Sequence, residues 1–429
     1  MNFEEALRDL DGRQSEAKPE PSLDRIRLVA DLLDHPELTY PTVHVTGTNG
    51  KTTTTRMIAA LGCAHGLSTG AFISPHVTSL TERLSVCGQD MIEEEFGEEY
   101  ERLLPYFDQV GVVDGRRVTY FEALTALAYV WFADKPVALG VFEVGMGGTW
   151  DATNLIRGDV AVLCPIGVDH RELGSTPAQT AVEKAGIIKE GRAAVVREQR
   201  PEVLEVIRGR ADDVGAVLLL EEEAFAISDR KQALGGQSLS IRGLHSTYEE
   251  VFIPLFGQEL ARNAGAAVVA CEALLGRALD ERTMRQALRS VKSPGRLEVV
   301  ARRPLVVLDG AHNLDAAGAL TVALAEAFRW KRLHLVVGMF DDKDVEGVVP
   351  LLATLADRAY ACRSSSPRAA PVDRVAAALT AAGLDDIQTF QNVPAAVEAA
   401  RQEAGEDDLI LVTGSFYTVA DARPLFVGA

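Results

Sequence analysis

A glycine-rich run that contains one lysine is the feature of this sequence whose chemistry is most direct. The run is Gly47-Thr48-Asn49-Gly50-Lys51-Thr52, and a helical pattern begins near Thr52. In a strand–turn–helix of this kind, glycines let successive backbone N–H groups face an anion, and the lysine adds a full charge for the β and γ phosphates. The Thr52 hydroxyl can coordinate Mg²⁺. We therefore predict a site for ATP or GTP; the alternative is a turn that only joins a strand to a helix.

Polar residues also follow other apolar runs of the sequence. Glu143, the pair Asp169-His170 and Ser74 each stand at the end of such a run. In an open parallel sheet, ligands gather at the carboxyl ends of the strands. Carboxylate and hydroxyl oxygens suit Mg²⁺, and imidazole is a common metal ligand. We predict that Glu143, His170 and Ser74 join Thr52 at a magnesium site.

Each of these positions also has a structural interpretation. Asp151 and Asn154 follow Glu143 closely, and all three residues could cap and brace a glycine-rich turn. A lone histidine such as His170 is more often a packed or surface residue than a ligand. The segment 183–189 falls on the helix expected after His170, where by itself it is an ordinary charged face.

The elements that would position these residues follow from the alternation of short apolar runs with Ala/Leu/Glu-rich helical patterns. This alternation indicates βαβ units and an α/β fold. The strands predicted around the site are 42–46, 138–144 and 160–165. The pattern weakens at 218–254, where alternating residues predict antiparallel strands at a sheet edge. We expect a P-loop ATPase-like N-terminal domain with a mostly parallel sheet.

A Pro-Gly break at 293–296 interrupts this pattern and predicts a hinge. Beyond the break, helical patterns separate strands that are predicted at 305–308, 333–337, 358–362 and 409–413. These strands are enough for a small Rossmann-like, doubly wound C-terminal domain. We predict two domains, residues 1–293 and 294–429.

The composition and net charge of the chain indicate which kinds of partner and cellular location to expect. A chain of 429 residues that is 47% hydrophobic is too long for one compact core. Its net charge of -19 argues against binding nucleic acid or an anionic membrane. Early acids without an apolar run exclude an ordinary secretory signal, and no stretch approaches the roughly 18 apolar residues of a membrane span. The five cysteines stand singly, so we expect no disulfide framework, no zinc site and a cytoplasmic location.

Taken in order along the chain, these motifs resemble the folylpolyglutamate synthase/dihydrofolate synthase family, a branch of the Mur ligase superfamily. The further segments that carry the resemblance are Ser74-Pro75-His76, Glu82-Arg83, Tyr120-Phe121-Glu122, Pro294-Gly295-Arg296, Asp309-Gly310-Ala311-His312-Asn313 and Gly414-Ser415-Phe416-Tyr417. The resemblance implies an enzyme that phosphorylates a carboxylate with ATP. The amine of L-glutamate then attacks the acyl phosphate to form an amide, with dihydropteroate or a folyl-glutamate as the acid.

The resemblance also implies residue roles. The residues implied to hold two magnesium ions are Thr52, Ser74, Glu143 and His170, and Lys184 matches the lysine that the family carbamylates. The residues implied in catalysis are Lys51, His170, Lys184, Arg296 and His312. Besides the phosphate loop, the nucleotide contacts implied are Asn263 near adenine, the hinge residue Arg296 on the phosphates, and Asp309 at the ribose. The pterin is implied to lie near the loop at 74–83 and Tyr120.

Two departures from the family pattern keep an alternative open. Lys51-Thr52-Thr53 is similar to the peptidoglycan Mur ligases, and Glu259-Leu260 replaces a His-Gln pair. The alternative is a divergent Mur-like ligase that joins an amino acid to a different carboxylate. From another class, a P-loop kinase or an ATP-gated binding protein would form no amide. We expect small-molecule substrates and a monomer.

Overall fold

β1 (Thr42–Thr46), the strand before the glycine-rich run, lies inside an eight-stranded sheet. The computed structural model describes residues 1–14, 22–168 and 171–427. The strand order is β4-β3-β2-β5-β1-β6-β7-β8, in which β3 and β4 are antiparallel to their neighbours and the others are parallel. Every residue of β1 is buried, as expected where both faces of a parallel sheet are covered. The other strands are β2 (Thr69–Phe72), β3 (Leu84–Val86), β4 (Gln89–Asp90), β5 (Leu139–Glu143), β6 (Val160–Leu163), β7 (Ala193–Val196) and β8 (Val217–Leu220).

α3 (Lys51–Ala64) begins directly at the lysine of the glycine-rich run. Its apolar residues, Met57 and Ile58 among them, pack with Val43 and Val45 of β1 in one core cluster. This packing holds the start of α3 at the carboxyl end of β1. The other helices of this domain are α1 (Phe3–Asp11), α2 (Asp24–Leu32), α4 (Glu93–Asp114), α5 (Tyr120–Asp134), α6 (Pro177–Ala185), α7 (Pro201–Val214), α8 (Gln258–Leu275) and α9 (Glu281–Ser290).

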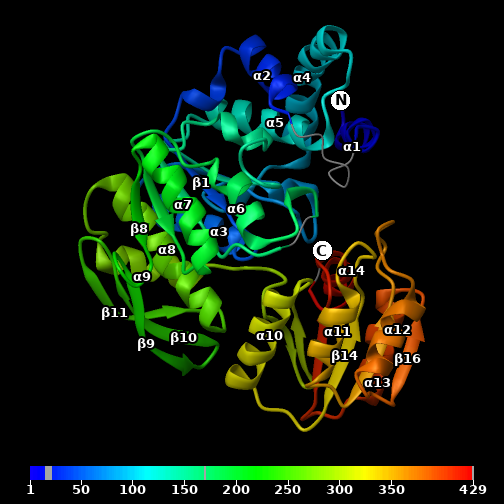
Figure 1. The fold of residues 1–429 in the computed structure, drawn as a ribbon. Helices are drawn as coiled ribbons and strands as arrows, with labels where there is room; N and C mark the ends of the chain where they lie inside the picture. The colour runs from blue at the N-terminus through cyan, green and yellow to red at the C-terminus, as the bar shows by residue number, and fades with distance from the viewer. Residues whose placement is uncertain (15–21, 169–170, 428–429) are drawn as a thin grey trace.

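The segment 218–254 differs from the edge strands that its sequence predicts. Its antiparallel strands form a separate three-stranded sheet of β9 (Ala226–Ala233), β10 (Gly236–Arg242) and β11 (Thr247–Ile253). The inner residues Leu239, Ile241 and Val251 pack in the same core cluster as α8 and α3. The sheet is separate because its apolar face covers the helices rather than extending the large sheet, and Figure 1 shows it beside α8 and α9.

The C-terminal domain is built on a six-stranded sheet in the order β12-β13-β17-β14-β15-β16. β12 is antiparallel to β13, and the other strands are parallel. The predicted strands recur here with their bounds unchanged, as β13 (Leu305–Leu308), β14 (Leu333–Val337), β15 (Arg358–Cys362) and β17 (Leu409–Thr413). The remaining elements are β12 (Glu298–Arg302), β16 (Ile387–Phe390), α10 (Leu314–Ala327), α11 (Val345–Ala353), α12 (Val372–Ala381), α13 (Val393–Glu403) and α14 (Phe416–Ala422).

Figure 1 shows the two sheets in separate lobes, with α14 at the end of the C-terminal lobe that faces the N-terminal lobe. The lobes touch through specific contacts. Phe256 packs on Phe328 with ring centroids 4.8 Å apart. Val77 of the N-terminal domain is buried in a cluster of C-terminal residues that includes Val306 and Val419. The predicted fold class, a mostly parallel N-terminal sheet with a Rossmann-like C-terminal domain, is therefore confirmed, whereas the exact division at residue 293 stays a prediction.

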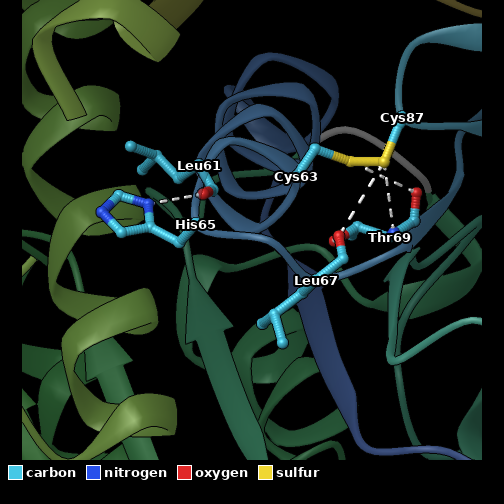
Figure 2. The surroundings of a disulfide bond; sticks show 6 residues. All are labelled: Leu61, Cys63, His65, Leu67, Thr69 and Cys87. Atoms are coloured by element: carbon cyan, nitrogen blue, oxygen red, sulfur yellow. Dashed lines mark hydrogen bonds between the residues drawn. A yellow bond between two sulfur atoms is a disulfide. The ribbon is translucent and has the colours of Figure 1, made fainter. Parts of the chain in front are cut away.

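One expectation about the cysteines is wrong: Cys63 and Cys87 form a disulfide with a Cα–Cα distance of 5.5 Å. Cys63 lies in the last turn of α3, and Cys87 lies in the turn after β3. β3 pairs antiparallel with β2, so Val86 lies opposite Gly70 and the turn returns to the end of α3. Figure 2 shows Leu67 and Thr69 around the bridge. Sequence spacing could not predict the disulfide because only this strand pairing brings the two thiols together.

No helix in the described part of the chain is long and apolar enough to cross a lipid bilayer.

Candidate active site

The glycine-rich run forms a tight loop between β1 and α3. Gly47 has a φ of +145°, and a Cβ atom there would lie 2.6 Å from the Cβ of Cys164. Gly50 has a φ of +93° and immediately precedes α3. The Thr48 N–H donates to the Pro165 carbonyl at 2.9 Å, which ties the loop to the end of β6. Both glycines are required because the backbone is left-handed there and larger residues would have no space.

Two lysine side chains meet at this loop. The Nζ atoms of Lys51 and Lys184 donate to the same Gly47 carbonyl, at 3.1 and 2.9 Å. Lys184 reaches the loop from the last turn of α6, and only 4% of its surface is exposed. Like charges this close repel each other, and an anion beside them would relieve the repulsion. The loop therefore offers the charge of Lys51 to a phosphate group, and that of Lys184 only while its amine is unmodified.

The predicted magnesium residues Thr52, Ser74 and Glu143 lie together. The Thr52 hydroxyl donates to Glu143 Oε1 at 2.9 Å, and the Ser74 N–H donates to Oε2 at 3.2 Å. Burial raises the pKa of the Glu143 carboxyl above its usual value, while the charge of Lys51 acts in the opposite direction. The parallel pairing of β5 with β1 and β2 places Glu143 at the same sheet edge as the loop.

This set of residues fits a magnesium ion. Carboxylate and hydroxyl oxygens are ligands that Mg²⁺ prefers. Glu143 is only 1% exposed, and a divalent cation would favour the ionised form of a carboxyl whose burial disfavours charge. The fourth predicted ligand, His170, and its neighbour Asp169 lie outside the described residues.

Asp151 and Asn154 brace the turn after Glu143 rather than face the loop. Asp151 accepts N–H groups from Met146 and Thr153 at 2.8 and 3.0 Å. The Asn154 side chain donates to the Thr149 carbonyl at 3.1 Å. For these two residues the structural interpretation accounts for the hydrogen bonds. The helix expected over 183–189 ends earlier, at Ala185, because Gly186 caps α6.

Arg296 comes from the segment between the two domains. Its guanidinium lies over the ring of Phe416, 4.0 Å from the centroid. Burial lowers the pKa of Arg296 from its usual value, and the carboxylates of Asp309 and Glu143 act in the opposite direction. Phe416, which packs against the guanidinium, belongs to α14 of the C-terminal domain. The predicted role of Arg296 at the phosphates stays a prediction.

Asp309 and His312 follow β13 and face the same region. Both Asp309 carboxylate oxygens accept backbone N–H groups, from Leu297 and Ala311, each at 2.9 Å. The backbone of Leu297 is left-handed, with a φ of +45°, so Asp309 holds a strained residue directly beside Arg296. His312 Nδ1 donates to the Gly310 carbonyl at 2.8 Å, which fixes the orientation of its ring.

Asn313 is a residue of this interface to which the sequence pattern alone assigns no role. Its side chain exchanges two hydrogen bonds with Asn49 of the phosphate loop, at 3.1 and 3.3 Å. A second link joins Thr53 Oγ1 of α3 and Ser293 Oγ at 2.7 Å. The phosphate loop and its helix are therefore attached to the hinge and to the second domain by direct polar contacts.

Asn263 on α8 lies against the phosphate loop, because a Cβ atom at Gly50 would be 2.9 Å from its Oδ1. Its amide also accepts a hydrogen bond from Arg197, a residue that sequence patterns did not single out. The signal was weak because Arg197 is one charged residue after an apolar run, with no motif around it.

The loop at 74–83, predicted to lie near a pterin, is tightly built. Glu82 accepts N–H groups from Thr78 and Ser79 at 2.8 and 3.1 Å. Arg83 Nε donates to His76 Nδ1 at 3.1 Å, and its guanidinium lies 5.5 Å from the ring centroid of Tyr120. These contacts place the Arg83 guanidinium against the rings of His76 and Tyr120.

Comparison with known domain families defines the class of this protein. The Mur ligase middle domain matches residues 45–271, and the Mur ligase glutamate ligase domain matches residues 295–416. The first match covers most of the lobe that contains the phosphate loop. The second match covers most of the lobe that contains Asp309 and His312. The fold is thus that of a Mur ligase.

Individual relatives narrow this class. The chain is 38% identical to dihydrofolate synthase/folylpolyglutamate synthase of Mycobacterium tuberculosis, over 97% of this chain and 92% of the relative. It is 31% identical to the Bacillus subtilis protein of the same name, over 94% of each. The chain belongs to the folylpolyglutamate synthase/dihydrofolate synthase family, within the Mur ligases.

Solved structures agree with this assignment. The Mycobacterium tuberculosis folylpolyglutamate synthase complexed with ADP and AMPPCP matches with a TM-score of 0.94 and 37% identity, over 100% of this chain and 98% of that one. Escherichia coli FolC in complex with DHPP and ADP matches with a TM-score of 0.88 and 32% identity, over 98% and 96%.

Proposed function

We propose that this chain joins L-glutamate to a folate-type carboxylate, dihydropteroate or a folyl-glutamate, through an acyl phosphate, and releases ADP and phosphate. The observation that supports it best is the set of hydrogen bonds at the phosphate loop: Thr52 bonds to Glu143 of the same domain, and Asn49 bonds to Asn313 of the second domain. Ser293, three residues before Arg296, bonds to Thr53 of the helix that follows the loop. A carboxylate that attacks a triphosphate meets strong charge repulsion. Fixed positive charge at the transferring phosphoryl group lowers that barrier.

The residue roles are part of this proposal. Residues 47–52 hold the phosphates with their N–H groups, Lys51 neutralises the β and γ phosphates, and Arg296 stabilises the phosphoryl group in transfer. Asn263 contacts the base, Asp309 the ribose, and His312 lies beside the reacting groups. The packing of the Arg83 guanidinium against the rings of His76 and Tyr120 supports a pterin site near the loop at 74–83.

Mg²⁺ at this site would be held by Thr52, Ser74, Glu143 and His170, with two ions in all, and would supply charge neutralisation on the phosphates. We propose that Lys184 is carbamylated. The approach of Lys51 and Lys184 to one carbonyl supports this, since carbamylation would turn Lys184 into an anion and remove a like-charge contact.

The proposal uses both lobes, divided at residues 293/294 and closing about residues 293–296. The contacts Asn49–Asn313 and Thr53–Ser293 support a closure that brings Arg296 over the loop. We propose a monomer that acts on small molecules in the cytoplasm.

The test is a screen of ADP release and amide formation by the purified enzyme, with L-glutamate and either dihydropteroate, a folyl-glutamate or unrelated acids. Lys51→Ala should abolish turnover. Arg296→Ala should keep the circular dichroism spectrum and lower kcat by about 10²–10³-fold, as for other groups that stabilise charge in a transition state. Near-normal turnover by either variant would refute the assigned roles.

The screen also decides between substrates. Turnover on a different acid, with none on either folate-type acid, would favour the divergent Mur-like ligase, which Lys51-Thr52-Thr53 and Glu259-Leu260 keep open. ATP hydrolysis without any amide product would contradict both ligases.

A further inference from the structure

Arg197 is a buried arginine at the edge of the nucleotide region, and none of the roles above uses it. It follows β7 directly, and its side chain is 1% exposed. Glu221 follows the neighbouring strand β8, and β7 and β8 pair with Val196 opposite Leu220. Adjacent strand ends therefore place Arg197 beside Glu221, and Nε donates to Glu221 Oε2 at 3.0 Å.

The other two arms of the guanidinium reach α8. Nη2 donates to Glu259 Oε2 at 2.9 Å, and Nη1 donates to Asn263 Oδ1. Glu259 is the residue that departs from the family pattern, and here it is a partner of Arg197. The glutamate at position 259 therefore supplies a hydrogen-bond acceptor for the buried guanidinium of Arg197.

The contact with Asn263 decides which way its amide faces. A guanidinium only donates hydrogen bonds, and an asparagine amide has one acceptor atom. Oδ1 must therefore face Arg197, and the NH₂ group is directed elsewhere. The amide is buried, 1% exposed, and lies against Gly50 of the phosphate loop.

We propose that Arg197 is a positioning residue for the nucleotide: it fixes the Asn263 amide so that the NH₂ group is presented to an acceptor atom of the base. This inference rests on the proposed ATP site. Without Arg197 the amide could turn either way, and the base would lose a preorganised donor. The phosphates, which are held by the loop, would keep their contacts.

The test compares ATP with tripolyphosphate, a probe that has the phosphates and no base. Arg197→Met should raise the KM for ATP about tenfold, the value of one hydrogen bond, with kcat changed little. The inhibition constant of tripolyphosphate should stay within about twofold of the wild-type value, since phosphate contacts are kept. Arg208→Met, an exposed arginine on α7, is the matched control and should leave both constants unchanged.

Equal losses for ATP and tripolyphosphate, or no loss for either, would overturn the inference. Glu221 is completely buried, so Arg197→Met could fail to fold. Arg197→Lys keeps a cation beside Glu221 but lacks the fork that also reaches Asn263, and it should show the same selective loss. Normal turnover by Lys51→Ala would instead refute the ATP site itself, so the two failures are distinguishable.

Discussion

The Gly50→Ala substitution tests two structural requirements at this position of the phosphate loop, a left-handed backbone and free space beside Asn263. The backbone there is left-handed, and a Cβ atom would lie 2.9 Å from Asn263 Oδ1. Gly66 is the matched control because its backbone is also left-handed, with a φ of +85°, and a Cβ there meets nothing within 4 Å. The pair of variants differs mainly in the contact with Asn263.

The magnitudes follow from these environments. Left-handed backbone costs a residue with a Cβ about 1–2 kcal/mol, which applies to both variants. Overpacking against the buried Asn263 side chain adds about 1–3 kcal/mol, which applies to Gly50→Ala alone. We expect Gly66→Ala to lose about 1–2 kcal/mol in the free energy of unfolding with unchanged kinetics. Gly50→Ala should lose about 2–5 kcal/mol, and kcat/KM for ATP should fall.

The assays are urea unfolding and steady-state kinetics with ATP as the varied substrate. The same substitution in an Asn263→Ala background supplies the decisive comparison, because the smaller side chain removes the close contact. There, the stability loss of Gly50→Ala should shrink to that of Gly66→Ala. Equal losses for the two glycine variants in the wild type, or a loss unaffected by Asn263→Ala, would refute the reasoning.

Three further predictions concern other parts of the chain. Cys63→Ser, Cys87→Ser and the double variant should each lower stability by about 3–4 kcal/mol, from a sequence separation of 24. Calorimetry should show that a reductant lowers the wild-type melting temperature and not that of the double variant. Thr53→Val should lower the free energy of unfolding in urea by about 1–3 kcal/mol, because it leaves the Ser293 hydroxyl without its hydrogen-bond partner. In a Ser293→Ala background, most of this loss should disappear. Burial lowers the pKa of Lys189 to about 8. The unfolded chain therefore binds more protons between about pH 8 and 10.5, so wild-type stability relative to Lys189→Met should rise with pH across that window.

Each of these three predictions has a result that would contradict it. A melting temperature that reductant does not move would contradict the disulfide. A Thr53→Val loss that persists in the Ser293→Ala background would contradict the buried hydroxyl pair. A stability difference between wild type and Lys189→Met that is flat above pH 8 would contradict the lowered pKa.

The chain's local patterns were sufficient for the phosphate loop and most of the α/β framework. The run from Gly47 to Thr52 and the strand before it depend on neighbouring residues, and β1 has the predicted bounds. Glu143 and Ser74 could be assigned to one sheet edge because parallel strands bring their carboxyl ends together. These predictions needed only the order of elements and the chirality of their connections.

Other features depend on contacts between distant segments. The bridge from Cys63 to Cys87 needs the pairing of β3 with β2, and the sheet of β9–β11 needs an apolar face on the helices. The hydrogen bonds from Arg197 to Glu221 and Asn263 require two adjacent strand ends and helix α8, which begins more than sixty residues later in the chain. The sequence by itself determined the loop at which we propose that phosphate binds. Tertiary packing decided how the loop is held, because side chains far apart in the chain make those contacts.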